Sequence, residues 1–242
     1  YVRSIQTAGG EALAIHTVRA YVQAAGRFAR YLAFREIIPG DPFANLRLPR
    51  LPKTVLRNVP TESEMEKILA YLADWEAVGP DTRAQGRRYI AHLVAELQYA
   101  SGLRIAEVAA LELDDLDLVK RRVYVRNGKK GKSRVAYLTE YAASILSIFL
   151  SRMRSVVLTA KQADNPEKVF GCGHEALSHS QNGHLAEVSE KIGMKITSHT
   201  FRHALGYHLL RAGCPLRQIQ EMLGHEQIKD TEIGRASCRE RG

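Results

Sequence analysis

The most informative stretch of this sequence is His199-Thr200-Phe201-Arg202-His203, which is followed one predicted helical hairpin later by Leu223-Gly224-His225. His199 and Arg202 are three residues apart, so on a helix they share a face. A guanidinium presents a planar fork of donors that matches two phosphate oxygens, and an imidazole can donate or accept a proton near neutral pH. The spacing therefore predicts a helix that presents phosphate ligands.

Capping signals define the helices around this stretch. Ser198 is expected to cap a helix over 198–212, and Gly213 is expected to close it. Pro215 then opens a helix over 215–223, and Gly224 ends that helix directly before His225. A lone His-x-x-Arg pair on a helix is often only a solvated face, but here the histidine at 225 follows a defined helix end.

The composition is that of an ordinary globular protein with a clear excess of positive charge. The 242 residues include 35 Lys and Arg against 26 Asp and Glu, a formal net charge of +9. This charge favours a polyanionic partner without distinguishing DNA from RNA or acidic lipid. No apolar run reaches the roughly 20 residues that span a bilayer, and no signal peptide is recognisable, so we expect a cytoplasmic protein without membrane contact. The three cysteines form no C-x-x-C pair, which argues against a disulfide framework or a zinc ribbon.

The hydrophobic periodicity predicts a mainly α-helical chain with one small antiparallel β-sheet. Helices are expected over 11–38, 61–72, 87–99, 104–111, 140–155, 183–192, 198–212 and 215–223. The alternating segments 122–126 and 134–138 predict a β-hairpin around a loop of glycines and lysines. The residues expected to face inward from the helix over 87–99 are Ile90, Leu93, Val94 and Leu97.

Four prolines between Pro39 and Pro52 interrupt regular structure and divide the chain into two expected domains. The expected segments are a partial helical domain over 1–52, a linker over 53–60, a second domain over 61–231 and a non-native tail over 232–242. The second domain begins at a capping box of Thr61 and Glu64. The last segment is expected to be non-native because residues Glu232 to Cys238 match the translation of a sequencing adaptor.

A second candidate phosphate site is Gly102-Leu103-Arg104-Ile105-Ala106-Glu107. It places Arg104 at the start of a helix, where unpaired backbone N–H groups and the positive end of the helix dipole also favour a phosphate. Glu107 lies three residues further on and can hold Arg104 in place. Taken alone, the same two residues are more typical of a surface ion pair.

A weaker candidate, for a metal site, consists of Cys172, His174, His179 and His184. Their spacing does not place adjacent ligands on one helix face, and glycines and serines separate them. We therefore expect a solvent-exposed connection here and no metal site.

In chain order, these motifs resemble the tyrosine recombinases, also called the phage integrase family. The resemblance rests on Gly102-Leu103-Arg104-x-x-Glu107, the hairpin with Lys129, His199-x-x-Arg202-His203 and Leu223-Gly224-His225. It implies a partial helical core-binding domain over 1–52 and a catalytic domain over 61–231. It also implies site-specific cleavage and rejoining of double-stranded DNA through a 3′-phosphotyrosyl intermediate, by a homotetramer on two DNA sites and without metal or other cofactor.

The resemblance implies catalytic roles for the matching cations. Arg104 and Arg202 would clamp the scissile phosphate and neutralise the charge that grows on its non-bridging oxygens. Lys129 would protonate the leaving 5′-oxygen, and we favour it over Lys130 for this role. The residues of the same hairpin that are expected to bind DNA are Lys130, Lys132 and Arg134.

The matching histidines and the glutamate have further implied roles. His199 would assist proton transfer at the nucleophile, and His225 would hydrogen-bond the phosphate. Glu107 would orient Arg104 without reacting, and His203 would pack behind the arginine at 202.

The nucleophilic tyrosine is missing from the position where the resemblance places it. It should follow His225 by about nine residues, where Gly234 stands, and no tyrosine follows Tyr207. We therefore expect the chain as printed not to cleave DNA. Two alternatives stay open: a natural paralogue that binds DNA without a nucleophile, and a helix-turn-helix regulator built on 198–212 and 215–223. A regulator would leave Arg104 and Lys129 unexplained.

Overall fold

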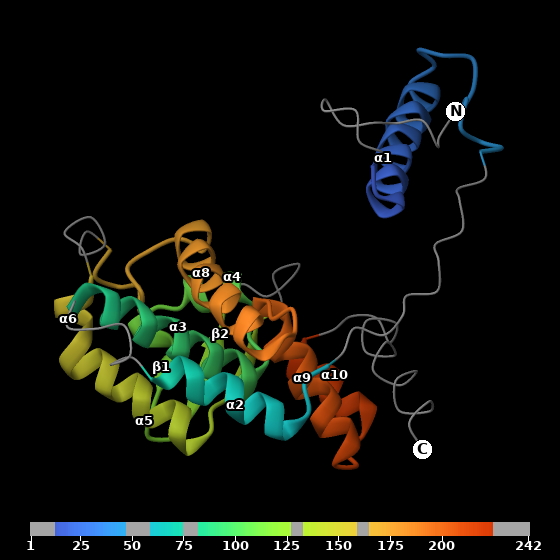
Figure 1. The fold of residues 1–242 in the computed structure, drawn as a ribbon. Helices are drawn as coiled ribbons and strands as arrows, with labels where there is room; N and C mark the ends of the chain where they lie inside the picture. The colour runs from blue at the N-terminus through green and yellow to red at the C-terminus, as the bar shows by residue number, and fades with distance from the viewer. Residues whose placement is uncertain (1–12, 47–58, 75–81, 127–132, 159–164, 225–242) are drawn as a thin grey trace. The chain divides into compact units, whose positions relative to one another are not determined.

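The computed structural model describes residues 13–46, 59–74, 82–126, 133–158 and 165–224. Contacts divide the chain into two units, Tyr1–Arg57 and Asn58–Gly242, and this boundary falls within the segment 53–60 that was expected to be a linker. In Figure 1 the first unit is the blue part of the chain, and the second runs from cyan to red.

The described part of the first unit is a helix and the turn that follows it. The helix, α1 (Ile15–Phe34), lies within the span 11–38 predicted from the sequence. After the helix, Asp41 pairs with Arg30 at an Oδ2–Nε distance of 3.6 Å, and Phe43 packs against Gly26. The turn therefore folds back along α1.

The second unit is built around α3 (Thr82–Ser101). The other helices described in this unit are α2 (Glu62–Ala73), α4 (Ile105–Ala110), α5 (Glu140–Ile148), α6 (Arg154–Val157), α8 (His174–Ile192), α9 (Ser198–Arg211) and α10 (Leu216–Leu223). A 3-10 turn spans Leu113–Asp115, and a π-helical turn spans Phe149–Met153 between α5 and α6. Figure 1 shows α3 between its neighbours, and it packs against α2, α4, α5, α8 and α9. The inward face predicted for this helix is confirmed, because Ile90, Leu93, Val94 and Leu97 are all buried.

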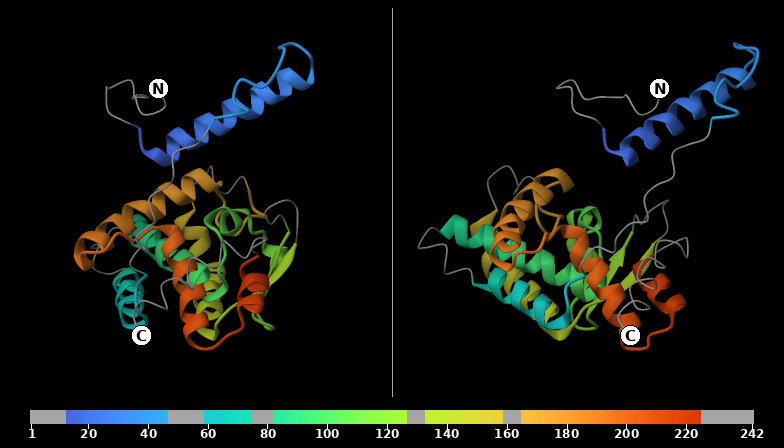
Figure 2. Two further views of the ribbon diagram at one scale, coloured as in Figure 1. Left: turned by 90° about the vertical axis from the view of Figure 1, so that its right-hand side faces the viewer. Right: turned by 45° about the vertical axis from the view of Figure 1, so that its right-hand side comes forward.

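A three-stranded antiparallel sheet completes the unit, in the order β1-β2-β3. Its strands are β1 (Leu116–Asp117), β2 (Arg122–Val125) and β3 (Arg134–Tyr137). The hairpin of β2 and β3 confirms the prediction, whereas β1 was not predicted. Val123 pairs with Ala136 and both are buried, so this face of the hairpin points inward. Because side chains alternate along a strand, Arg134 shares the inward face with Ala136. Both views in Figure 2 place the yellow-green hairpin beside the red helix α10.

Apolar side chains form separate clusters that share α3. The largest joins α3 to α4, the hairpin and α5, and Leu97 belongs to it. A second cluster packs Met65 and Ile68 of α2 against Phe201 of α9, with Ala95 supplied by α3. Since α3 contributes to both clusters, burial fixes α9 beside the C-terminal half of α3. This packing brings the two arginine motifs of the sequence to one place.

The start of α8 differs from the prediction. The helix begins at His174, nine residues earlier than expected, and Leu177 and Gln181 are buried on it. The expected irregular connection is therefore wrong from His174 onward, whereas His174 and His179 are solvent-exposed as expected. Polar residues and Gly183 hide the helical periodicity in this segment, and it is contact with the rest of the unit that supports the helix.

The start of α9 also differs in its cap. Thr197 is the N-cap, and its backbone N–H donates to Thr200 Oγ1 at 2.9 Å. Ser198, the predicted cap, is instead buried and its Oγ accepts a hydrogen bond from Gln98 Nε2 at 2.7 Å. The hydroxyl that was expected to cap the helix thus fastens α9 to α3. Gly213 and Gly224 follow their helices with φ of 85° and 63°, which confirms both predicted helix ends.

The capping box predicted at the start of α2 is present, and we expect it to stabilise the folded chain. Thr61 Oγ1 accepts from the Glu64 N–H at 3.2 Å, and Glu64 Oε2 accepts from the Thr61 N–H at 2.7 Å. Thr61→Ala should lower the free energy of unfolding by about 1 kcal/mol in urea denaturation. Ser63→Ala, an exposed change in the same turn, is the control and should cost less than about 0.5 kcal/mol. A loss for Thr61→Ala no larger than that of the control would contradict the prediction.

Candidate functional site

Gly102 ends α3 and delivers Arg104 to the start of α4. Its φ of 67° is left-handed, and its N–H donates to the Gln98 carbonyl at 2.9 Å. A Cβ atom at this position would overlap with Leu223 Cδ2, so no side chain fits without a shift. Leu223 is the last residue of α10, and the two sequence motifs therefore meet at this glycine.

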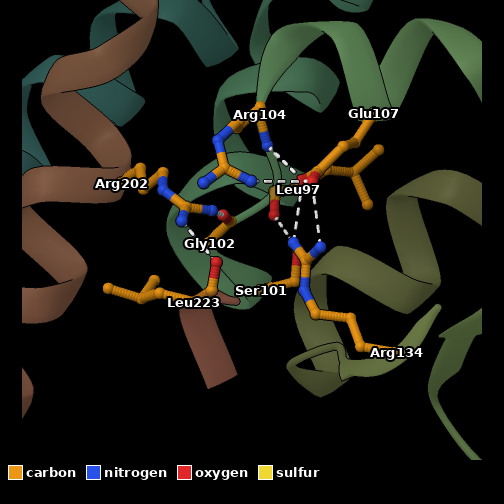
Figure 3. A network of polar contacts seen from close by, with 8 residues as sticks. All are labelled: Leu97, Ser101, Gly102, Arg104, Glu107, Arg134, Arg202 and Leu223. Atoms are coloured by element: carbon orange, nitrogen blue, oxygen red, sulfur yellow. Dashed lines mark hydrogen bonds and ion pairs between the residues drawn. The ribbon is translucent and has the colours of Figure 1, made fainter. Parts of the chain in front are cut away.

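Glu107 of α4 is the centre of the polar network in Figure 3. Its side chain is only 5% exposed. From Arg104, it accepts hydrogen bonds from Nη1 on Oε1 and from the backbone N–H on Oε2, both at 2.9 Å. Arg134 of β3 donates two further hydrogen bonds to this carboxylate, from Nη1 to Oε1 at 2.9 Å and from Nη2 to Oε2 at 2.8 Å. One carboxylate thus orients two arginines, which confirms the predicted Arg104–Glu107 contact.

The charge state of Glu107 follows from these partners. Burial by itself would raise the pKa of this carboxyl group, because it disfavours the charged form. Hydrogen bonds from Arg134 and from the Arg104 backbone, together with the charges of both arginines, outweigh burial and lower the pKa to about 2. The carboxylate is therefore ionised throughout the neutral range.

Arg202 lies on α9 with only 4% of its surface exposed, and backbone carbonyls orient it. Its Nη1 donates to the carbonyl of Gly102 and its Nη2 to the carbonyl of Leu223 (Figure 3). Burial and then the charge of Arg104 lower the pKa of Arg202 to about 9. Within the described ranges no carboxylate forms an ion pair with Arg202. A buried cation beside other cations is unfavourable unless an anion joins it, which marks this as a candidate anion site.

The two described histidines of the motif lie on the outer side of α9. His199 is exposed one turn before Arg202, and its ring centroid is 6.3 Å from that of His203. His203 is exposed as well. Phe201 and Ala204 are the buried neighbours in this turn.

The structure brings together Arg104, Glu107 and Arg202, although Arg104 and Arg202 are 98 residues apart in the sequence. The predicted site residues that lie outside the described residues are Lys129, Lys130, Lys132, His225 and Gly234. The bidentate pair of Arg134 with Glu107 was not predicted. Strand alternation was the signal that could have found it, since an arginine on the inward face needs a buried acceptor.

The three histidines of the weaker metal-site candidate are spread around α8. His174, His179 and His184 follow each other at five-residue intervals, which do not share a face of a helix. Among the residues with described coordinates, no group of three or more His, Cys, Asp or Glu side chains is arranged to hold a metal ion. None of the helices in the described part of the chain is both long and apolar enough to cross a bilayer.

Known proteins resemble this chain in sequence. The family model for the phage integrase family matches residues 58–239. The tyrosine recombinase XerC of Pelotomaculum thermopropionicum is 33% identical over 213 residues, which cover 85% of this chain. The chain spans 65% of the length of that relative.

Solved structures share the fold. The XerH site-specific recombinase bound to palindromic difH substrate, in a post-cleavage complex, is 20% identical with a TM-score of 0.70, covering 96% of this chain and 63% of that one. The Tn1549 transposon integrase in complex with a circular intermediate DNA is 17% identical with a TM-score of 0.67, covering 95% and 80%. The predicted fold, mainly helical with a small antiparallel sheet, is thus confirmed.

The family match discriminates between the predicted alternatives. It spans the Arg104 motif, the hairpin and the α9–α10 pair in one continuous segment. A helix-turn-helix regulator would account for the last of these alone and is not favoured. The chain belongs to the phage integrase family, the tyrosine recombinases.

Proposed function

We propose that this chain carries the phosphate-binding centre of a site-specific recombinase that cleaves and rejoins double-stranded DNA. The observation that carries the proposal is Arg202, a buried guanidinium oriented by two carbonyls next to Arg104. The carboxylate of Glu107 pairs with Arg104 and Arg134, and Arg202 adds a third positive charge nearby, which leaves excess positive charge in the centre. A phosphodiester would supply the missing anion, and the planar guanidinium fork matches its oxygens.

The proposed chemistry transfers the scissile phosphorus from a DNA oxygen to a tyrosine. Attack by the tyrosine hydroxyl forms the phosphotyrosyl bond and breaks the bond to the 5′-oxygen, while negative charge grows on the two non-bridging oxygens. Arg104 and Arg202 would neutralise this charge. Lys129 would protonate the leaving 5′-oxygen, and His199 would assist proton transfer at the tyrosine. These roles are proposals by resemblance; no metal or cofactor takes part in them.

A tyrosine placed at position 234 should restore covalent chemistry. We propose to incubate the Gly234→Tyr chain with a randomised pool of nicked DNA duplexes, in which the cleaved strand cannot be rejoined. Denaturing electrophoresis should then show a protein–DNA adduct that is absent with the chain as printed. Gly234→Phe is the matched control, because it differs from the tyrosine variant only by the hydroxyl that would attack.

Salt dependence of DNA binding separates the outcomes of this experiment. Binding to duplex DNA should weaken steeply with salt, since each phosphate contact contributes about 0.9 to the log–log slope. A slope near zero would contradict a nucleic-acid function altogether. Salt-dependent binding without an adduct from Gly234→Tyr would instead favour the paralogue that occupies DNA without cutting it.

Assembly and location belong to the same proposal. A homotetramer on two DNA sites is expected from the family resemblance, and the cytoplasm is expected because the substrate would be DNA. Sedimentation of the chain with and without duplex DNA would measure the assembly directly.

A further inference from the structure

Arg134 connects three segments that come together at the centre. It begins β3, 27 residues after Glu107 in sequence, and both of its terminal nitrogens donate to the carboxylate of that residue. The side chain is only 12% exposed. Glu107 in turn holds the guanidinium and the backbone N–H of Arg104. Arg134 therefore reaches Arg104 through one shared carboxylate (Figure 3).

The other side of Arg134 faces the end of α10. A Cβ atom built on Gly224 would lie 3.3 Å from Arg134 Cδ and 3.4 Å from its Nε and Cζ, so the backbone of Gly224 approaches the guanidinium closely. The preceding residue, Leu223, accepts the hydrogen bond from Arg202. Arg134 thus packs against the same segment that orients Arg202.

These contacts leave Arg134 little capacity to bind DNA. Each terminal nitrogen directs one N–H group to Glu107, the Nε is buried without a hydrogen-bond partner among the described residues, and little of the side chain reaches solvent. A phosphate contact would need a donor that faces solvent. The geometry is that of a side chain that supports other residues of the site.

We infer that Arg134 is a positioning residue for strand cleavage, which acts through Glu107 to hold Arg104 against the scissile phosphate and does not itself contact DNA. The inference rests on the proposed function. It assigns to Arg134 a role different from the DNA contact expected from the sequence.

The first test replaces Arg134 in the Gly234→Tyr background. Arg134→Met should slow adduct formation by roughly 10- to 100-fold, because a misplacement of about 1 Å in a reacting group costs about 100-fold. Affinity for duplex DNA and its salt slope should stay unchanged. Arg134→Lys should slow adduct formation less, because an ammonium keeps the charge but cannot reproduce the bidentate fork.

Arg122→Met is the matched control for loss of charge. Arg122 belongs to the same sheet, is paired across the strands with exposed Tyr137 and lies 5.7 Å from the centre of that ring. Its removal should change neither the rate of adduct formation nor the salt slope. Circular dichroism must show every compared variant folded at the assay temperature, and Arg134→Lys provides the comparison if Arg134→Met does not fold.

A double-mutant cycle with Glu107→Gln tests whether Arg134 acts through the carboxylate. If it does, the double variant should form adduct no more slowly than Glu107→Gln alone, because both changes remove the same link between Arg134 and Arg104 through the carboxylate. If the reductions in rate caused by the two single changes multiply in the double variant, the inference is overturned. A salt slope that falls by about one in Arg134→Met would overturn it as well, since that result would show a direct phosphate contact.

Failure of the inference differs from failure of the proposed function. If Gly234→Tyr with Arg134 intact forms no adduct, the proposed function fails and the positioning role falls with it. If that chain forms adduct and Arg134→Met forms it equally fast, only the positioning role is overturned. A carbon NMR titration of the Glu107 carboxyl adds a readout that needs no DNA: its pKa should rise in Arg134→Met, and an unchanged value would contradict the coupling.

Discussion

Replacing Arg202 by methionine in the Gly234→Tyr background should reduce adduct formation by roughly 100- to 1,000-fold, the usual cost of removing one donor to a developing oxyanion. The variant should nevertheless stay folded. At neutral pH Arg202 is buried as a cation, and a pKa lowered from 12.5 to about 9 corresponds to about 5 kcal/mol of unfavourable free energy. Methionine removes this cost but leaves the carbonyls of Gly102 and Leu223 without their donor, at about 1 to 3 kcal/mol each.

The two effects on stability therefore largely offset each other, and the free energy of unfolding should change by no more than about 3 kcal/mol. Urea denaturation of the same preparation measures this. Arg211→Met removes an exposed arginine from the end of the same helix and should leave adduct formation unchanged. Adduct formation by Arg202→Met within tenfold of the parent rate would rule out the assigned role in binding phosphate.

Glu107→Gln should have the largest effect on stability, a loss of about 3 to 5 kcal/mol at pH 7. Removing one partner of a buried ion pair leaves the others uncompensated, and here two arginines lose their shared carboxylate. The matched control is Glu221→Gln, which breaks an exposed pair with Arg217 and should cost less than about 0.5 kcal/mol. Equal losses of unfolding free energy in the two variants would show that the network around Glu107 stabilises the chain no more than an exposed ion pair does.

The same carboxylate defines a pH window. Because folding lowers the pKa of Glu107 from 4.5 to about 2, its contribution to stability is fully present above pH 4.5 and disappears as the pH falls toward 2. Across that window the parent chain should lose about 3 kcal/mol more than Glu107→Gln does. The two stabilities should converge near pH 2. Parallel curves in urea denaturation from pH 2 to 6 would contradict the assignment of the pKa.

Local sequence signals predicted most helices and the hairpin correctly because those signals act over neighbouring residues. The capping box at Thr61 and the left-handed glycines at 213 and 224 need only a few adjacent residues to form. The start of α8 was missed for the opposite reason. Its first two turns carry few apolar residues, and Leu177 and Gln181 are buried by contacts that the local pattern does not contain.

The candidate site was predicted in its residue types but only partly in its contacts. Arg104 and Glu107 are three residues apart on one helix, so their contact was visible in the sequence. The hydrogen bonds of Arg202 to Gly102 and Leu223 span 100 and 21 residues. Such pairings depend on how α9 packs against α3, which no short motif specifies.

By itself, the sequence determined the family, most of the helical and hairpin elements, and the residue types of the candidate site. Only the tertiary structure decided which groups orient those arginines. Strand β3 turns Arg134 toward the carboxylate of Glu107, and the ends of α3 and α10 present the carbonyls that hold Arg202. The physical reason is burial: an arginine removed from water must find acceptors, and the packing of distant elements determines which acceptors are within reach.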